Sequence, residues 1–245
     1  MKKIFSFFCA GFCVYSAQSL SAPFEIKVHD ELIADYQQSA YEVETNLFQA
    51  PASQNLKTNV FQTRLEYGYG ITEKSEIGAN IYLSNYNGIS YVNGGKISHM
   101  YIPTHDEDGL WHYGVKNEIN YIKDVGGNET TYYELTPILA LQLTDWRFTI
   151  NPSVDITLNK NSTATFSPSA KVAYSITNTT DIGMEYYADN LPNKSLYNLT
   201  QQPHTAYLVV DTKYNNSEIN IGVGKGVTAT SDNWVIKLIA SLHFD

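Results

Sequence analysis

The chain has 245 residues and carries 25 Asp and Glu against 16 Lys and Arg, a formal net charge of −9 at pH 7. Proteins that bind nucleic acids usually present a basic surface, so this balance excludes a nucleic-acid partner. The mean hydropathy is −0.27, and beyond the first residues no stretch is apolar enough for a membrane-spanning helix.

The N-terminus has the layout of a secretory signal peptide. A start with two lysines leads into an apolar run over 4–14, and small polar residues follow. We expect cleavage after Ser21, which removes residues 1–21 on export; cleavage after Ser19 or Ala22 is the alternative. Both cysteines, Cys9 and Cys13, lie in this segment. The exported protein would therefore have no disulfide and no cysteine metal site.

Beyond the signal, apolar and polar residues alternate. The stretch WRFTINPSVDITL over 146–158 places its apolar residues on one parity and its polar residues on the other. Side chains alternate across a strand, so this stretch has one apolar and one polar face. Similar patterns predict strands at 40–48, 59–71, 75–86, 96–103, 110–123, 130–143, 146–158, 164–176, 180–189, 204–214, 217–227 and 232–244.

Two features favour a closed barrel over a soluble β-sandwich. Short connections such as 144–145 and 215–217 alternate with longer ones such as 85–95 and 190–203, as short periplasmic turns and longer outer loops do in outer-membrane barrels. Aromatic residues of the apolar parity also gather near both ends of the strands, where rings favour the membrane boundary. We predict an all-β protein: a closed antiparallel transmembrane β-barrel of about 12 strands.

The barrel is expected to span 39–245, after a periplasmic or plug-like segment over 22–38. In the last segment, NWVIKLIASLHFD, Phe244 is the final residue of the apolar face, and Asp245 follows it. This segment resembles the C-terminal strand signal of bacterial outer-membrane barrels. We therefore expect the outer membrane of a Gram-negative bacterium as the location, with the barrel-assembly machinery and outer-membrane lipids as partners.

Five segments carry a family resemblance: PFEIKVHDELIADYQQSAYEVETNL, LEYGYGITEKSEIGANIYL, YYELTPILALQLTDWRFTINP, FSPSAKVAYSITNTTDIGMEYYADN and GVGKGVTATSDNWVIKLIASLHFD. Over nearly the whole mature chain they resemble the outer-membrane transporter family called "MetA-pathway of phenol degradation". The resemblance implies a twelve-stranded barrel that passes small, often aromatic, compounds.

The polar parity directs charged residues toward the lumen. The lumen-lining candidates are Arg64, Glu66, Lys116, Glu118, Glu134, Arg147, Asp155, Lys171, Glu185 and Asp211. Arg64 and Arg147, the only arginines in the chain, are expected near the same rim, where they would narrow the lumen. Paired charges would seal the barrel; the other interpretation is a water-filled or partly plugged channel.

Three prolines stand in successive predicted strands on the lipid-facing parity: Pro137, Pro152 and Pro168. Proline contributes no N–H to a ladder, and a closed barrel has no edge strand to accommodate the loss. They are either independent bulges or a lateral seam through which an apolar solute leaves the lumen for the bilayer.

The favoured function is passive uptake of small aromatic or hydrophobic solutes. One alternative is a sealed structural or surface-interaction barrel, and a second is a lipid-modifying enzyme of the outer membrane. His112 and His243 have the inward parity, but neither stands in a serine-bearing motif that would indicate a hydrolase. We therefore expect no enzyme, and no residue pattern indicates a cofactor or a metal.

The orientation can be tested by thiol labelling. Cysteines introduced in the loop 190–203 should react with impermeant thiol reagents on intact cells, because this loop is expected outside. Cysteines at 144–145 or 215–217 should stay unlabelled until the cells are lysed. The reverse pattern would overturn the orientation.

Overall fold

The computed structural model describes residues 24–49, 59–104, 109–124, 126–159, 163–188, 191–192 and 202–244. The expected signal peptide, most of the loop 190–203 and Asp245 lie outside these residues. The wall strands are β1 (Ser39–Gln49), β2 (Asn59–Thr72), β3 (Ser75–Tyr86), β4 (Ile89–Tyr101), β5 (Trp111–Lys123), β6 (Glu129–Gln142), β7 (Trp146–Thr157), β8 (Ala164–Thr177), β9 (Thr180–Ala188), β11 (His204–Tyr214), β12 (Ser217–Gly226) and β13 (Trp234–Phe244).

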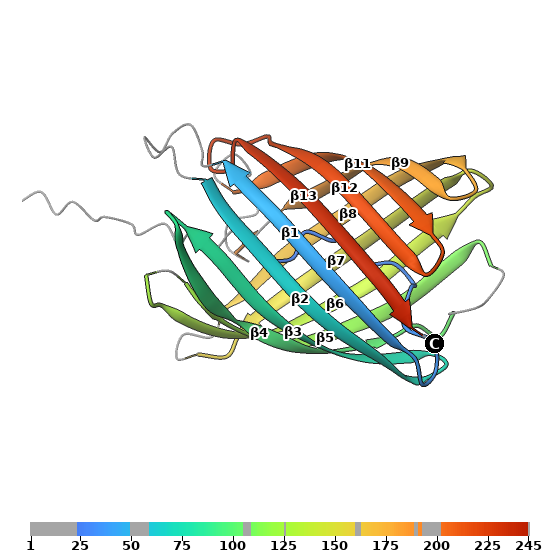
Figure 1. Ribbon diagram of the computed structural model, residues 1–245, viewed down its shortest axis with the longest axis horizontal. Coiled ribbons are helices and arrows are strands. Elements are labelled where there is room, and N and C mark those ends of the chain that lie inside the picture. Colours follow the sequence, from blue (N-terminus) through green and yellow to red (C-terminus); the bar gives the residue numbers. More distant parts are fainter. Residues whose placement is uncertain are drawn as a thin grey trace, which may run out of the picture.

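These twelve strands form a closed antiparallel barrel (Figure 1). Each strand pairs with the next along the chain, and the ring closes where β1 pairs with β13 from Ser39↔Phe244 to Gln49↔Trp234. The two-residue strand β10 (Leu191–Pro192) adds only a short pairing to β8. The all-β closed barrel predicted from the sequence is confirmed. The described residues include no helix that is long and apolar enough to cross a membrane.

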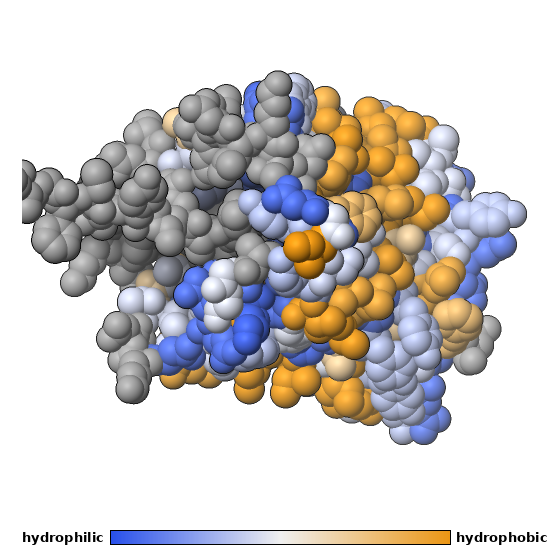
Figure 2. Space-filling view, turned by 60° about the vertical axis from the view of Figure 1, so that its left-hand side comes forward, coloured by the Kyte–Doolittle hydropathy of each residue, from blue (hydrophilic) through white to orange (hydrophobic). Residues whose placement is uncertain are grey.

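The barrel wall is apolar outside and polar inside. On β1, Tyr41 and Val43 are 48% and 44% exposed, whereas Glu44 and Asn46 are 0% and 1% exposed. Figure 2 shows hydrophobic side chains gathered in a band across the wall, with paler and hydrophilic ones beyond it. Strands of 9 to 14 residues are long enough to cross a bilayer when tilted, which takes about 9–11 residues. The barrel is therefore built for a lipid surrounding.

Aromatic side chains cluster at the end of the barrel where β1 begins and β13 ends. The ring of Tyr41 lies 5.2 Å from that of Tyr67 and 5.5 Å from that of Phe244, and further round the wall Trp146 lies 4.9 Å from Tyr174. We call this end periplasmic, following the orientation expected from the loop lengths. Exposed aromatic residues also mark the opposite, outer end: Tyr121, Tyr186 and Trp234.

The fourth predicted strand is wrong at its start. The alternation indicated 96–103 after a long loop, but β4 begins at Ile89 and pairs with β3 immediately after a turn at Asn87 and Gly88. Their φ values are 52° and 79°, which fits the two-residue hairpin turn that an Asn-Gly pair favours. The expected long outer loop over 85–95 is therefore a tight hairpin.

A β-bulge explains why the pattern concealed this strand. The β3–β4 register shifts between Tyr82 and Leu83, and Gly94 on the opposite strand has a φ of 124°. A bulge inserts one residue and so reverses the parity of the side chains beyond it. Asn93 and Lys96 consequently both face inward, three residues apart, and no strict alternation runs through the strand.

Residues 24–38 pass through the inside of the barrel (blue segment in Figure 1). Ile26 and Val28 pack in a buried cluster with lumen-facing residues of β1, β9, β11 and β13. Ile33 packs against Met100, Ile102 and Ile138. At the periplasmic rim Gln37 N–H donates to Gly70 O at 2.8 Å, and the chain then turns into β1.

Candidate functional site

The candidate site is the lumen, and its centre is the segment that runs through it. Residues 24–29 alternate as a strand does, with Phe24, Ile26 and Val28 apolar and Glu25, Lys27 and His29 polar. This alternation lets one face contact the aromatic wall formed by Phe48, Tyr187 and Tyr207, while the other face contacts charged groups.

Glu25 lies among cations from three strands. Its Oε1 is 3.4 Å from Arg64 Nη1, 3.4 Å from Lys116 Nζ and 3.4 Å from His29 Nε2, and Oε2 contacts Lys96. One carboxylate on the inner segment thus neutralises charges contributed by β2, β4 and β5. A buried charge is tolerated when it is paired in this way.

Arg64 connects the same cluster to β1. Its guanidinium is 0% exposed and donates to Glu44 Oε2 from Nε at 3.1 Å and from Nη2 at 2.9 Å, and it contacts Glu42 and Glu66. Glu118 completes the network through ion pairs with Lys96 at 2.6 Å and with Lys116 at 2.8 Å. We call these residues, with Glu25, the central charge network.

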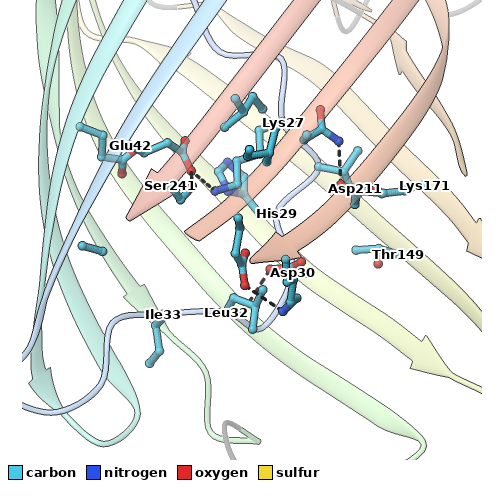
Figure 3. A pocket seen from close by; sticks show the side chains of 18 of the residues that line it. Lys27, His29, Asp30, Leu32, Ile33, Glu42, Thr149, Lys171, Asp211 and Ser241 are labelled. Atoms are coloured by element: carbon cyan, nitrogen blue, oxygen red, sulfur yellow. Dashed lines mark hydrogen bonds and ion pairs between the residues drawn. The ribbon is translucent and has the colours of Figure 1, made fainter. Parts of the chain in front are cut away.

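Other contacts hold the backbone of the segment to the wall. His29 N–H donates to Asn151 Oδ1 at 2.7 Å, and Asn151 Nδ2 donates back to His29 O at 2.9 Å. Lys237 Nζ donates to Ile26 O at 2.9 Å, and Lys27 forms an ion pair with Glu42 at 2.7 Å (Figure 3). The segment is therefore attached to several sides of the barrel.

Two cavities lie on either side of this segment, and Lys27 and His29 line both. The periplasmic chamber has a volume of about 200 Å³ and includes Asp30, Lys171 and Asp211 (Figure 3). The outer chamber has a volume of about 440 Å³ and extends from Phe24 and Glu25 to residues at the outer end of β5 and β6. Residues 24–38 thus divide the lumen.

The outer chamber has an acidic wall. Glu134 and Asp155 line it and stand directly opposite each other on β6 and β7. Asp124, in the loop after β5, also lines it and accepts hydrogen bonds from the Asn128 backbone and side chain, both at 2.8 Å. Slight burial would raise the pKa of Asp124, but hydrogen bonds from Asn128 and from the backbone of Gly126 and Gly127 together lower the pKa.

Two of the three prolines, Pro137 and Pro152, lie where the β6–β7 pairing is interrupted. The third, Pro168, lies in the β7–β8 ladder, whose described pairing is continuous. The β6–β7 register contains Leu135↔Val154 and Leu139↔Ile150, and in this described wall no pairs connect 136–138 with 151–153. Pro152 is opposite Pro168 on β8, and Pro168 lines the outer chamber. Inside the gap, Thr136 Oγ1 and Ser153 Oγ share a hydrogen bond of 2.8 Å. A side-chain contact thus replaces main-chain bonds.

The structure distributes the predicted lumen residues over three places. Arg64, Glu66, Lys116 and Glu118 meet around Glu25. Lys171 binds Asp211 at 2.8 Å and approaches Glu185 at 3.4 Å. Glu134 and Asp155 face the outer chamber.

The expectation that both arginines narrow one rim is wrong. Arg64 lies in the middle of β2, whereas Arg147 is the second residue of β7 and pairs with Glu31 near the periplasmic end. The two side chains therefore belong to separate clusters. β2 begins at the outer end and reaches Arg64 midway across the wall, whereas β7 begins at the periplasmic end, next to Arg147.

Sequence reasoning missed Glu25, Lys27 and His29, although FEIKVH alternates as clearly as any wall strand. It also missed Lys96, whose inward direction depends on the bulge in β4. Of the inward histidines, His112 has a buried Nδ1 without a hydrogen-bond partner in the described residues.

No protein-family model and no curated protein sequence matches the chain. Among solved structures, the barrel is similar to the KdgM porin in complex with disordered oligogalacturonate, with a TM-score of 0.58 and 9% identity over 84% of this chain and 99% of that one. It is also similar to the NanC porin, with a TM-score of 0.54 and 14% identity over 82% and 98% of the two chains. At such identities these likenesses show the fold.

Replacing Arg64 should destabilise the barrel strongly. Arg64→Met would leave Glu44 buried without its cation and Glu42 with Lys27 alone, and breaking a buried pair in this way costs about 3–5 kcal/mol. Urea unfolding of the refolded protein in detergent micelles measures the effect. Lys123→Met is the matched control, because its pair with Glu129 is 2.9 Å long and about half exposed. Solvent screens such a pair, so its loss should leave the unfolding midpoint nearly unchanged. Equal losses in the two variants would contradict the role of the central charge network.

Proposed function

We propose that the protein is an outer-membrane channel of a Gram-negative bacterium for passive uptake of small aromatic or hydrophobic compounds. The observation that carries the proposal is the outer chamber, whose volume of about 440 Å³ suits a small molecule. Its floor includes Phe24 and Glu25, and its wall reaches Ser153 and Pro168 beside the interrupted β6–β7 ladder. A solute that enters from outside thus arrives at a floor and at a weak part of the wall.

The axial route is occupied by residues 24–38. These residues separate the two chambers and are attached through Glu25, Lys27 and His29 to several strands. We propose that this segment acts as a plug and that the solute leaves sideways. Because the outer surface of the wall is apolar, an exit through the β6–β7 gap would lead into lipid, and this route suits apolar solutes better than sugars or ions.

Membership of the family called "MetA-pathway of phenol degradation" is part of the same proposal. It is supported by the five segments that resemble the family and by a barrel with the strand number that the family implies. Outer-membrane lipids would contact the apolar band, and the barrel-assembly machinery would read the strand that ends on Phe244.

A sealed structural barrel is the second candidate. The dense ion pairing of the central charge network favours it, because such pairing fills the lumen on the side of β1 to β5. The two candidates differ in what happens when the plug is removed and when the seam is closed.

Removing the plug should open the axial path. Deleting residues 24–34 should give larger and steadier single-channel conductance in a planar bilayer than the parent chain, because the two chambers would join. Asn159→Ala, which removes the Asn159 hydrogen bonds to Glu129 O and from the Thr131 N–H at the outer end, is a control for handling and refolding. A deletion variant that stays silent would favour the sealed barrel.

Closing the seam should reduce uptake. Leu135→Cys with Val154→Cys joins register partners beside the gap, and opposite residues of antiparallel strands lie about 4.5–5.5 Å apart at Cα, within disulfide range. Uptake of radiolabelled phenol by expressing cells should fall several-fold on oxidation and recover on reduction. Leu141→Cys with Phe148→Cys, also register partners, is the matched control away from the gap. If uptake is the same with the first disulfide closed or open, the prolines only bend the wall and form no exit.

A further inference from the structure

The outer chamber contains carboxylates without cations. No Lys, Arg or His nitrogen of the described residues lies within 4 Å of Glu134, Asp155 or Asp124, whereas the other acid of the chamber, Glu25, contacts four basic side chains. The basic residues of the chamber are already engaged: Lys27 binds Glu42, and His29 lies next to Glu25 and Lys116. The three carboxylates on this side of the chamber thus have no positively charged partner among the described residues.

Glu134 and Asp155 form a dyad across β6 and β7. Thr136 Oγ1 donates to Glu134 Oε1 at 2.9 Å, and Ser167 Oγ donates to Asp155 Oδ2 at 2.8 Å. Asp155 Oδ1 is buried and has no hydrogen-bond partner among the described atoms. Two adjacent carboxylates repel each other unless a proton or a cation lies between them.

A second, independent polar group is also unsatisfied. Asn120 is 1% exposed and lines the chamber. Its Oδ1 accepts the Tyr82 hydroxyl at 2.8 Å, but its Nδ2 has no partner in the described structure. A buried donor without a partner is costly, so this amide is positioned to donate to a hydrogen-bond acceptor in the chamber.

Aromatic side chains supply the remaining surface. The rings of Phe24 and Tyr82 stack with their centroids 4.8 Å apart, and Tyr132 and Tyr187 also line the chamber. Aromatic faces attract organic cations and stack with aromatic rings. The described residues contain no group of three or more His, Cys, Asp or Glu that could hold a metal ion, which favours an organic cation over a metal.

We propose that the outer chamber binds a small aromatic amine, with its ammonium on the Glu134–Asp155 dyad, its ring against the aromatic residues and an acceptor such as a hydroxyl oxygen on Asn120 Nδ2. This inference rests on the proposed channel function and names the class of solute. The amine leaves through the β6–β7 gap as its neutral base, with its proton remaining on a dyad carboxylate and passing from there to water in the chamber.

The test is calorimetric titration of the refolded full-length protein in detergent with tyramine and with p-cresol, which has the same phenol ring but no amine. Tyramine should bind the parent at least tenfold more tightly than p-cresol. Glu134→Gln and Asp155→Asn should each weaken tyramine binding at least tenfold and leave p-cresol binding unchanged. Glu218→Gln removes the same charge from the periplasmic chamber and should change tyramine binding less than twofold.

Several results would overturn the proposal. They are absence of tyramine binding to the parent, equal binding of p-cresol, or tyramine binding that survives both dyad substitutions. A dyad-dependent Ca²⁺ titration without tyramine binding would instead make it a metal site. Because unmatched carboxylates are removed, both dyad variants should keep the parent's midpoint in urea unfolding, so weaker binding would not reflect misfolding.

The binding measurement requires no transport, which keeps the two proposals separable. Suppose that tyramine binding depends on the dyad but phenol uptake is unchanged by the β6–β7 disulfide. The binding site would then be retained and the lateral route rejected. If instead the disulfide reduces phenol uptake while tyramine binding does not depend on the dyad, the lateral route would be retained and the binding site rejected.

Discussion

The lipid around the barrel determines where its charges lie. A strand in a closed wall has only two faces, and the face toward the hydrocarbon must be apolar. Charged side chains in the middle of the described strands, such as Glu44, Arg64 and Lys116, are therefore directed inward, where they need partners. Register provides many of these partners: Glu44 stands directly opposite Arg64 on β1 and β2, so one hydrogen-bonded ladder also aligns an ion pair.

The acidic residues of the wall strands alone do not neutralise the basic residues in the lumen. Arg64, Lys96 and Lys116 converge from three strands, and the acids of the wall leave room for one more carboxylate among them. Glu25 fills this place from a segment outside the wall. The apolar residues of that segment simultaneously cover Phe48, Tyr207 and Val235, which also face inward. Charge and apolar contact together hold residues 24–38 inside the barrel, between the two chambers.

Strands could be predicted from the sequence wherever apolar and polar residues alternate without interruption. The predicted strand at 146–158 matches β7, and parity alone directed Glu134 and Asp155 inward. The failure at β4 has a local cause, because one bulged residue reverses the parity and hides Lys96.

The position of the inner segment required three-dimensional information. FEIKVH alternates like a wall strand, but its neighbours are side chains of distant strands, and a pattern along the chain does not identify them. The same limit applies to the dyad: parity places both acids inside, whereas their lack of a cation depends on which bases Glu25, Glu42 and Glu118 have already taken.

Thr136 connects the two unusual features of the outer chamber. Its hydroxyl lies 2.9 Å from Glu134 Oε1 and 2.8 Å from Ser153 Oγ, so it contacts both the acidic dyad and the only side-chain bridge described across the β6–β7 gap. A hydroxyl has one proton to donate. A cation on Glu134 competes for the carboxylate that accepts this proton, and the hydroxyl is then free to change its bond to Ser153. Since proline has removed main-chain donors on both sides of the gap, a change at this one hydroxyl would couple occupancy of the chamber to the strength of the seam.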